Sequence, residues 1–250
     1  MERMTHTFLL DPRPATDAFC TNYGTGSYEI RAVGIDSDGY PADAGLPDVT
    51  IQYRCGGRKC TLGTTSAIQG RYALQTRVPG ACTNPTILAN KEGYLTSETT
   101  LSADTWINLT KKKTLPVRVV KHAYFASVDK SISDTAEDLT DETAVVHVRS
   151  LDGRLDNVVM YPANGSSIEF IDGKSDYEID VIVSSGNTLI GGYHNSNITI
   201  SSNQIAQAGA VTFHAIEYRP IPISQEEQQA LAAFLYGGTY LSRLAPEMTP

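Results

Sequence analysis

The chain has 250 residues, of which 41% are hydrophobic and 19% charged, and its formal net charge at pH 7 is −8. This length suits two modest domains, each with its own core, and the low charged fraction favours turn-rich β-structure. The acidic balance argues against nucleic acid as a partner, because a phosphate-binding surface needs clustered Lys and Arg. The one basic run, Lys111 to Lys113, is interpreted as a solvated strand end.

The N-terminal residues 1–14 are predicted to form an arm outside the folded domains. Their apolar run FLL is too short for a secretory signal, so we expect either a protein that is not exported or a segment of a longer exported chain. No run approaches the roughly 18 apolar residues of a membrane-spanning helix, and membrane insertion is not predicted. MTHTFLL (4–10) alternates weakly and could add as a strand to a neighbour's open sheet edge; the alternative is a frayed terminus.

Short runs with alternating apolar residues follow along most of the chain, separated by turn signals such as Asp38-Gly39 and Asn164-Gly165. Examples of these runs are SYEIRAV (27–33), VTIQYR (49–54), TAVVHV (143–148), YEIDVIV (177–183) and VTFHAIEY (211–218). Many short strands at this spacing predict an all-β fold, a sandwich or a barrel, and we expect two β-sandwich domains of immunoglobulin-like type. The domains are placed at 15–114 and 115–222.

A C-terminal helical segment is predicted over 223–250. Ser224 followed by Glu227 is a capping-box signature, and QEEQQALAAFLY then supplies strong helix formers until Gly237 and Gly238. The helix is expected to pack across one of the sheets.

From about Ser27 to Ser97 the order of motifs resembles the carboxypeptidase-regulatory-like modules. The elements that carry the resemblance are Pro47 to Val49, Thr64 to Leu74, Pro79-Gly80 and Lys91 to Tyr94. With YRCGGRKCTLG (53–63), the stretch also looks like segments of uncharacterised archaeal cell-surface proteins. The resemblance implies a prealbumin-like sandwich without catalysis. It departs from the family at Ala81-Cys82, where the family usually has a small polar residue and Tyr.

The four cysteines are expected to meet at one end of this sandwich. With successive strands running up and down, Cys20, Cys55, Cys60 and Cys82 fall at the same end, which favours two disulfides. A redox pair and a zinc site remain as alternatives, although the spacing of Cys55 and Cys60 suits neither well. The sequence leaves the three possible pairings open.

Disulfides indicate an oxidising compartment, and three glycosylation sequons, at Asn108, Asn164 and Asn197, agree with an extracellular or cell-surface location. The five histidines form no metal-binding run, no catalytic motif occurs, and neither an enzyme nor a cofactor is predicted. Asp36, Asp38 and Asp43 are weak calcium candidates that are better explained by a β-turn. Tyr193 is predicted to contact a ligand.

These observations predict a non-enzymatic extracellular protein with a structural or adhesive role, and one form of that role is a filament subunit assembled by β-strand addition. Its partner would be another copy or a protein of the cell surface, or else a glycan. Two alternatives stay open: a virion surface or decoration protein, and a carbohydrate-binding module of a larger secreted protein.

Overall fold

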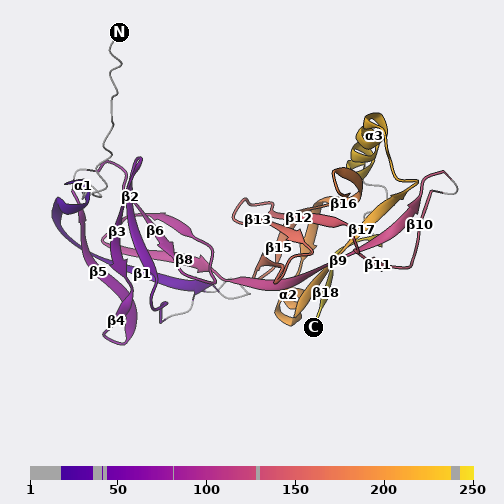
Figure 1. Cartoon of the computed structure of the whole chain (residues 1–250). Coiled ribbons are helices and arrows are strands. Elements are labelled where there is room, and N and C mark those ends of the chain that lie inside the picture. The colour runs from indigo at the N-terminus through magenta and orange to yellow at the C-terminus, as the bar shows by residue number, and fades with distance from the viewer. Residues whose placement is uncertain (1–17, 36–40, 42–43, 81, 128–129, 238–242) are drawn as a thin grey trace, which may run out of the picture. The chain divides into compact units, whose positions relative to one another are not determined.

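The computed structural model describes residues 18–35, 41, 44–80, 82–127, 130–237 and 243–250 (Figure 1). The predicted arm at 1–14 lies outside this range. The chain divides into two compact units. The first unit contains Met1–Ala32, Gly45–Ala89 and Ser97–Ile107, and the second contains Val33–Ala44, Asn90–Thr96 and Asn108–Pro250.

The first unit contains two four-stranded sheets that form a sandwich. One sheet has the order β4 (Ser66–Ile68), β5 (Arg71–Pro79), β1 (Tyr23–Ile35), β8 (Asp104–Thr110); the other has the order β3 (Arg58–Thr64), β2 (Thr50–Cys55), β6 (Thr86–Asn90), β7 (Ser97–Thr100). Both sheets bury β-branched residues, among them Ile30, Ile51 and Ile87, which are fully inaccessible to solvent. The short helix α1 (Ala18–Thr21) precedes β1.

The second unit is built on a ten-stranded sheet. Its main order is β10 (Ser131–Ile132), β9 (Lys112–Phe125), β17 (Ala210–Arg219), β16 (Thr188–Ile200), β15 (Ser175–Ser185), β12 (Thr143–Ser150), β13 (Asp156–Tyr161). β11 (Glu137–Asp138) and β14 (Ser167–Ile171) also pair with β9, and β18 (Glu247–Thr249) pairs with β17. The predicted domain boundary at 114–115 lies within β9, and β9 and β17 pair in parallel.

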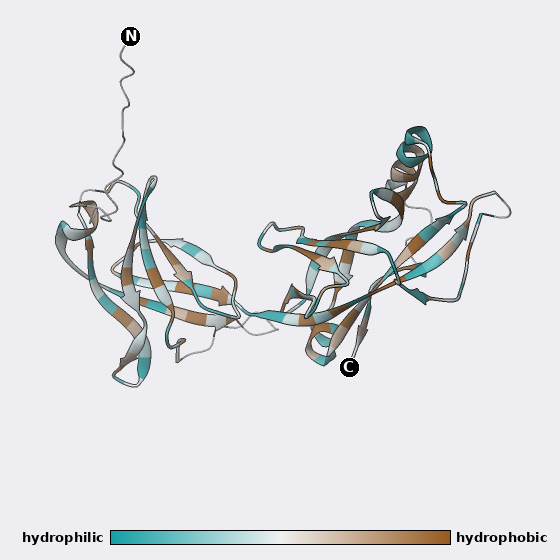
Figure 2. Ribbon diagram, in the orientation of Figure 1, coloured by the Kyte–Doolittle hydropathy of each residue, from teal (hydrophilic) through white to brown (hydrophobic). Residues whose placement is uncertain are grey.

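One hydrophobic core unites the strands of the second unit. Val119, Phe170 and Phe213 from one part of the sheet belong to the same buried cluster as Val146 and Val181 from the other. Apolar and polar residues alternate along these strands (Figure 2). This period of two buries one face, and the predicted all-β class with a short C-terminal helix is confirmed.

The predicted helix is α3 (Gln225–Tyr236), which begins with a complete capping box between Ser224 and Glu227. Leu235 packs over Gly192 of β16, so α3 covers part of the outer face of the sheet. The predicted helical segment 223–250 is not helical to its end, because Glu247–Thr249 form strand β18. A second capping box, Ser201 with Gln204, starts α2 (Ser202–Gln207), which the sequence analysis missed. Among the described residues, no helix has the length and apolarity needed to cross a membrane.

Substitution of Gly191 tests how closely the central strands β16 and β17 must pack. A Cβ atom there would lie 1.8 Å from the carbonyl oxygen of Ile216 on β17. We expect Gly191→Ala to destabilise the second unit by about 3 kcal/mol or more, since the backbones must separate. Urea unfolding followed by circular dichroism measures the loss. Gly57→Ala is the control, because a Cβ there meets no atom within 4 Å; equal stability of the two variants would contradict the argument.

Candidate functional site

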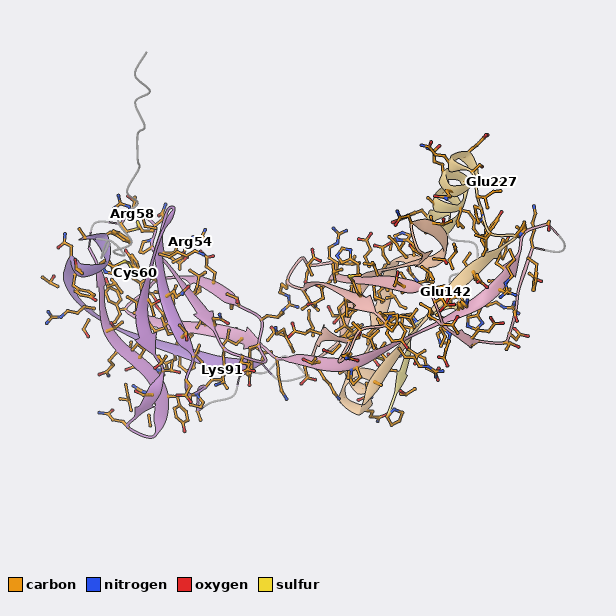
Figure 3. The ribbon with its side chains drawn as sticks, viewed as in Figure 1. Arg54, Arg58, Cys60, Lys91, Glu142 and Glu227 are labelled. Carbon is orange, nitrogen blue, oxygen red and sulfur yellow. A yellow bond between two sulfur atoms is a disulfide. The ribbon has the colours of Figure 1, made fainter. Side chains whose placement is uncertain are left out.

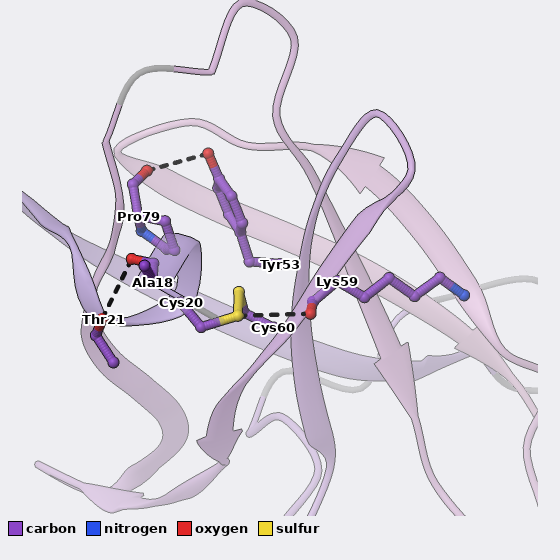
Figure 4. The surroundings of a disulfide bond; sticks show 7 residues. All are labelled: Ala18, Cys20, Thr21, Tyr53, Lys59, Cys60 and Pro79. Atoms are coloured by element: carbon purple, nitrogen blue, oxygen red, sulfur yellow. Dashed lines mark hydrogen bonds between the residues drawn. A yellow bond between two sulfur atoms is a disulfide. The ribbon is translucent and has the colours of Figure 1, made fainter. Parts of the chain in front are cut away.

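All four cysteines are paired in disulfides at one end of the first unit, Cys20 with Cys60 and Cys55 with Cys82. The first bridge ties α1 to the edge strand β3 (Figure 4). The second bridge ties the end of β2 to the segment after β5. Beside them the Tyr53 hydroxyl donates to the Pro79 carbonyl at 3.1 Å. The predicted disulfides are therefore present, and neither a dithiol nor a thiolate zinc site remains at this end.

The three sequon asparagines, Asn108, Asn164 and Asn197, are exposed. The prediction of a ligand contact at Tyr193 is wrong: this side chain is 1% exposed, inside the 13-residue strand β16 rather than beside a turn. Its hydroxyl accepts from the Asn195 amide, and burial raises its pKa. The calcium candidates Asp36, Asp38 and Asp43 lie outside the described residues.

The outer face of the second sheet carries polar side chains in register across three strands. His147 of β12 lies opposite Asp180 of β15, and Asp180 lies opposite His194 of β16. Glu178 is two residues from Asp180 on the same face, opposite Arg149. We call Glu178, Asp180, His194 and His147 the histidine–carboxylate cluster. Cross-strand partners have Cβ atoms about 5 Å apart, which brings their side chains into contact.

Hydrogen bonds order this cluster. His194 Nδ1 lies 2.7 Å from Asp180 Oδ1, and His147 Nε2 lies 2.6 Å from Asp156 of β13. Arg149 pairs with Glu178. From α3, Tyr236 places its ring 4.3 Å from that of His194, and burial with the negative charge of Asp180 raises its pKa. No local pattern in the sequence predicts this grouping, since its residues come from separate strands.

An apolar row lies beside the cluster on the same face. Val145 of β12 is opposite both Met160 of β13 and Ile182 of β15. Met160 is 61% exposed, and its neighbour Val158 is 63% exposed. β13 pairs with β12 at the end of the sheet and, among the described residues, with no other strand. Exposed apolar side chains on an edge strand are characteristic of a surface that pairs with another chain.

The first unit displays a different surface around Trp106, the single tryptophan of the chain, which is 46% exposed on β8. The Arg31 guanidinium lies 4.7 Å from the centre of its ring. Arg31 also pairs with Glu29, which accepts from Arg71 and Gln75. An exposed indole beside fixed polar groups can stack on a sugar ring or anchor a protein interface.

Two buried polar groups in the second unit serve its fold. Lys121 contacts both Glu217 and Glu142, the latter labelled in Figure 3. All three side chains are at most 11% exposed. Burial acts to raise the pKa of Glu142, but hydrogen bonds from Lys121 and the Thr140 amide outweigh it and lower the pKa to about 2. The arrangement is a satisfied ion triad rather than a group prepared for acid–base chemistry.

The second polar group is a histidine pair, in which His122 is buried and His214 half-buried. His122 Nε2 lies 3.0 Å from His214 Nδ1, and the Ser133 carbonyl lies 2.9 Å from His122 Nδ1. Burial, together with the charge of His122, lowers the pKa of His214. The pair links β9 to β17 and to the segment after β10.

The comparisons with known proteins find distant structural likeness. No protein-family model and no curated protein matches the sequence. The shaft pilin SpaA from Lactobacillus rhamnosus GG is 12% identical, with 80% of this chain and 100% of that chain covered and a TM-score of 0.25. A streptococcal ancillary pilin is 10% identical, with 78% of this chain and 63% of that chain covered and a TM-score of 0.28.

A leucine-rich repeat protein from Bacteroides thetaiotaomicron is 12% identical over 78% of this chain but 26% of its own, with a TM-score of 0.24. The chain thus spans about a quarter of that protein. Likeness at these scores establishes neither fold nor function, and the architecture rests on the strand pairing described above.

Loss of the Cys20–Cys60 bridge is expected to destabilise the first unit. It joins residues 40 positions apart, so its removal in the double variant Cys20→Ser/Cys60→Ser should cost about 3–4 kcal/mol. Trp106 fluorescence during urea unfolding reports on this unit. Reducing agent should then lower the urea midpoint of the wild type by more than that of the double variant, because the wild type has two bridges to lose and the variant has one. An unchanged unfolding midpoint in the double variant would contradict a stabilising role.

The pKa of Glu142 predicts an acid-sensitive second unit. Because it is lower in the folded state than the ordinary value of 4.5, the folded state binds this proton less readily. The ionised Glu142 therefore adds at most about 3 kcal/mol to the free energy of unfolding of the second unit, and this contribution is present above pH 4.5 and lost as the pH falls towards 2. Urea unfolding between pH 6 and pH 3 measures it. The free energy of unfolding of Glu142→Gln should depend less on pH than that of the wild type. The same pH dependence in both proteins would contradict the role of Glu142.

Proposed function

We propose that the chain is a non-enzymatic extracellular protein with a structural or adhesive role on a surface. The observation that carries the proposal is the pair of disulfides that uses every cysteine of the chain, because such bridges form and persist in oxidising compartments. The exposure of Asn108, Asn164 and Asn197 supports the same location, since a glycan can be attached only to an accessible side chain.

The exposed edge of the second unit supports self-association by strand addition. A strand from another copy would pair with β13 and cover Val158 and Met160, which are now in contact with solvent. The weakly alternating segment MTHTFLL (4–10) has the pattern of such a strand, with Met4, Phe8 and Leu10 in one row to face the partner. Head-to-tail addition of this kind produces filaments, because each copy donates one strand and accepts another.

Trp106 favours glycan recognition as a second candidate function. Its exposed ring, with the Glu29, Arg31 and Arg71 network beside it, supplies the stacking surface and the polar groups that sugar binding uses. A single aromatic side chain offers a sugar ring little stacking area, so we rank this function below self-association. Trp106→Ala should abolish any glycan binding while leaving the association of copies unchanged.

Self-association is tested at the β13 edge. Met160→Glu adds a charge that a second strand would have to bury, and deletion of residues 4–10 removes the proposed donor strand. We expect either change to reduce assembly at least about tenfold, which corresponds to roughly 1.4 kcal/mol. Analytical ultracentrifugation and electron microscopy of the wild type and both variants measure it.

The matched control for this test is Ile223→Glu, which places the same charge at a side chain that is 87% exposed and lies before α3. Assembly of this variant should equal that of the wild type. A wild type that stays monomeric at high concentration, or variants that assemble as it does, would contradict strand addition at β13.

A further inference from the structure

The histidine–carboxylate cluster has the composition and spacing of a metal site. One ligand atom from each of Glu178, Asp180 and His194 lies within 4.8 Å of the other two. Asp180 is shared: its Oδ1 contacts His194, and its Oδ2 lies 4.0 Å from Nδ1 of His147. Ligands about 2.0–2.1 Å from one ion are separated by roughly 3.3 Å, so small side-chain rotations bring these atoms to bonding positions.

The hydrogen bonds around the cluster leave one ring nitrogen of His147 facing Asp180, whereas an ion would replace the contacts of His194 with Asp180 and of Glu178 with Arg149. Asp156 holds Nε2 of His147, which fixes that nitrogen as the donor and leaves Nδ1 as the acceptor on the side of Asp180. A carboxylate that orients a histidine through its other ring nitrogen is a frequent partner of metal-binding imidazoles. Asp156 would therefore be a positioning residue for His147.

The charge balance favours a cation. Asp156, Glu178 and Asp180 contribute three carboxylates, and Arg149 contributes one guanidinium to the same group. With both imidazoles neutral, two negative charges remain uncompensated by these partners. The side chains of Asp180 and His194 are 17% and 14% exposed, so the charges are held in a partly dehydrated setting where a divalent ion interacts with them strongly.

We propose that Glu178, Asp180 and His194, joined by His147, form a binding site for a divalent transition ion of the zinc class. Mixed imidazole and carboxylate ligands select zinc over calcium and magnesium, which prefer sites made of oxygen alone. The ring of Tyr236, tilted by 40° against that of His194, shields one side of the site. A bound ion would join β12, β15 and β16 and so stabilise the outer face of the sheet next to α3.

Zinc titration of the full chain tests the site. After treatment with a chelator, calorimetry with Zn²⁺ should show one ion per chain and a higher unfolding temperature, whereas Ca²⁺ should have no effect. Asp180→Asn and His194→Gln should each weaken zinc binding at least about tenfold, and Asp156→Asn, which alters only the orienting group, about ten- to a hundredfold. Cobalt absorption in the visible range gives a readout of the ligand set that does not depend on stability.

His214→Gln is the matched control, since it removes a half-buried histidine of the same sheet that contacts His122 instead. Its zinc affinity should equal that of the wild type. If Asp180→Asn or His194→Gln does not fold, Glu178→Gln provides the same test at a more exposed position. No zinc binding at 100-fold excess over the protein, stronger binding of calcium, or loss of binding in His214→Gln alone would overturn the proposal.

Discussion

The register of β12, β15 and β16 determines both what the second unit buries and what it displays. His147, Asp180 and His194 face one another on the outer side, while Val146, Val148, Ile179 and Val181 alternate with them into the core. A slip of one residue would exchange the two faces and place the charged groups in the core. The burial of the valines and isoleucines therefore also holds the polar cluster together, and Gly191 permits the close approach of β16 to β17 on which this depends.

The first unit is stabilised in another way. Its sandwich is small, and the two disulfides restrain the end where α1, β2, β3 and the segment after β5 meet. Tyr53 is buried beside them and bonds to the carbonyl of Pro79, which joins the bridged end to the core. This rigid end and the exposed apolar edge of the second unit are the features that the proposed extracellular role uses, the first for durability and the second for contact with another copy.

The elements that depend on local pattern could be predicted from the sequence. Alternation identified the strand over 177–183, and Ser224 with Glu227 identified the start of α3. The same reasoning missed α2, whose capping residues were Ser201 and Gln204, and it did not show that Tyr193, which follows Gly191 and Gly192, is buried inside a strand. In the structure these glycines are strand residues, required by close packing rather than by a change of direction.

What the sequence could not supply is the pairing of distant strands. His147 and His194 are 47 positions apart, and only the order β16, β15, β12 brings them to the same aspartate. The disulfide pairing was unpredictable for the same reason, since Cys20 reaches Cys60 through a position of α1 that no local pattern determines. Such contacts depend on tertiary structure, which a single sequence does not specify through spacing alone.

The most direct test of the extracellular assignment is the intact mass of the protein from its native source, before and after reduction with alkylation. The account predicts that the unreduced protein lacks one hydrogen for each of its four cysteines, that it accepts alkylation only after reduction, and that glycan mass is present on Asn108, Asn164 or Asn197. Four free thiols in freshly isolated protein without glycan would contradict it, and would favour a protein made and retained in a reducing compartment.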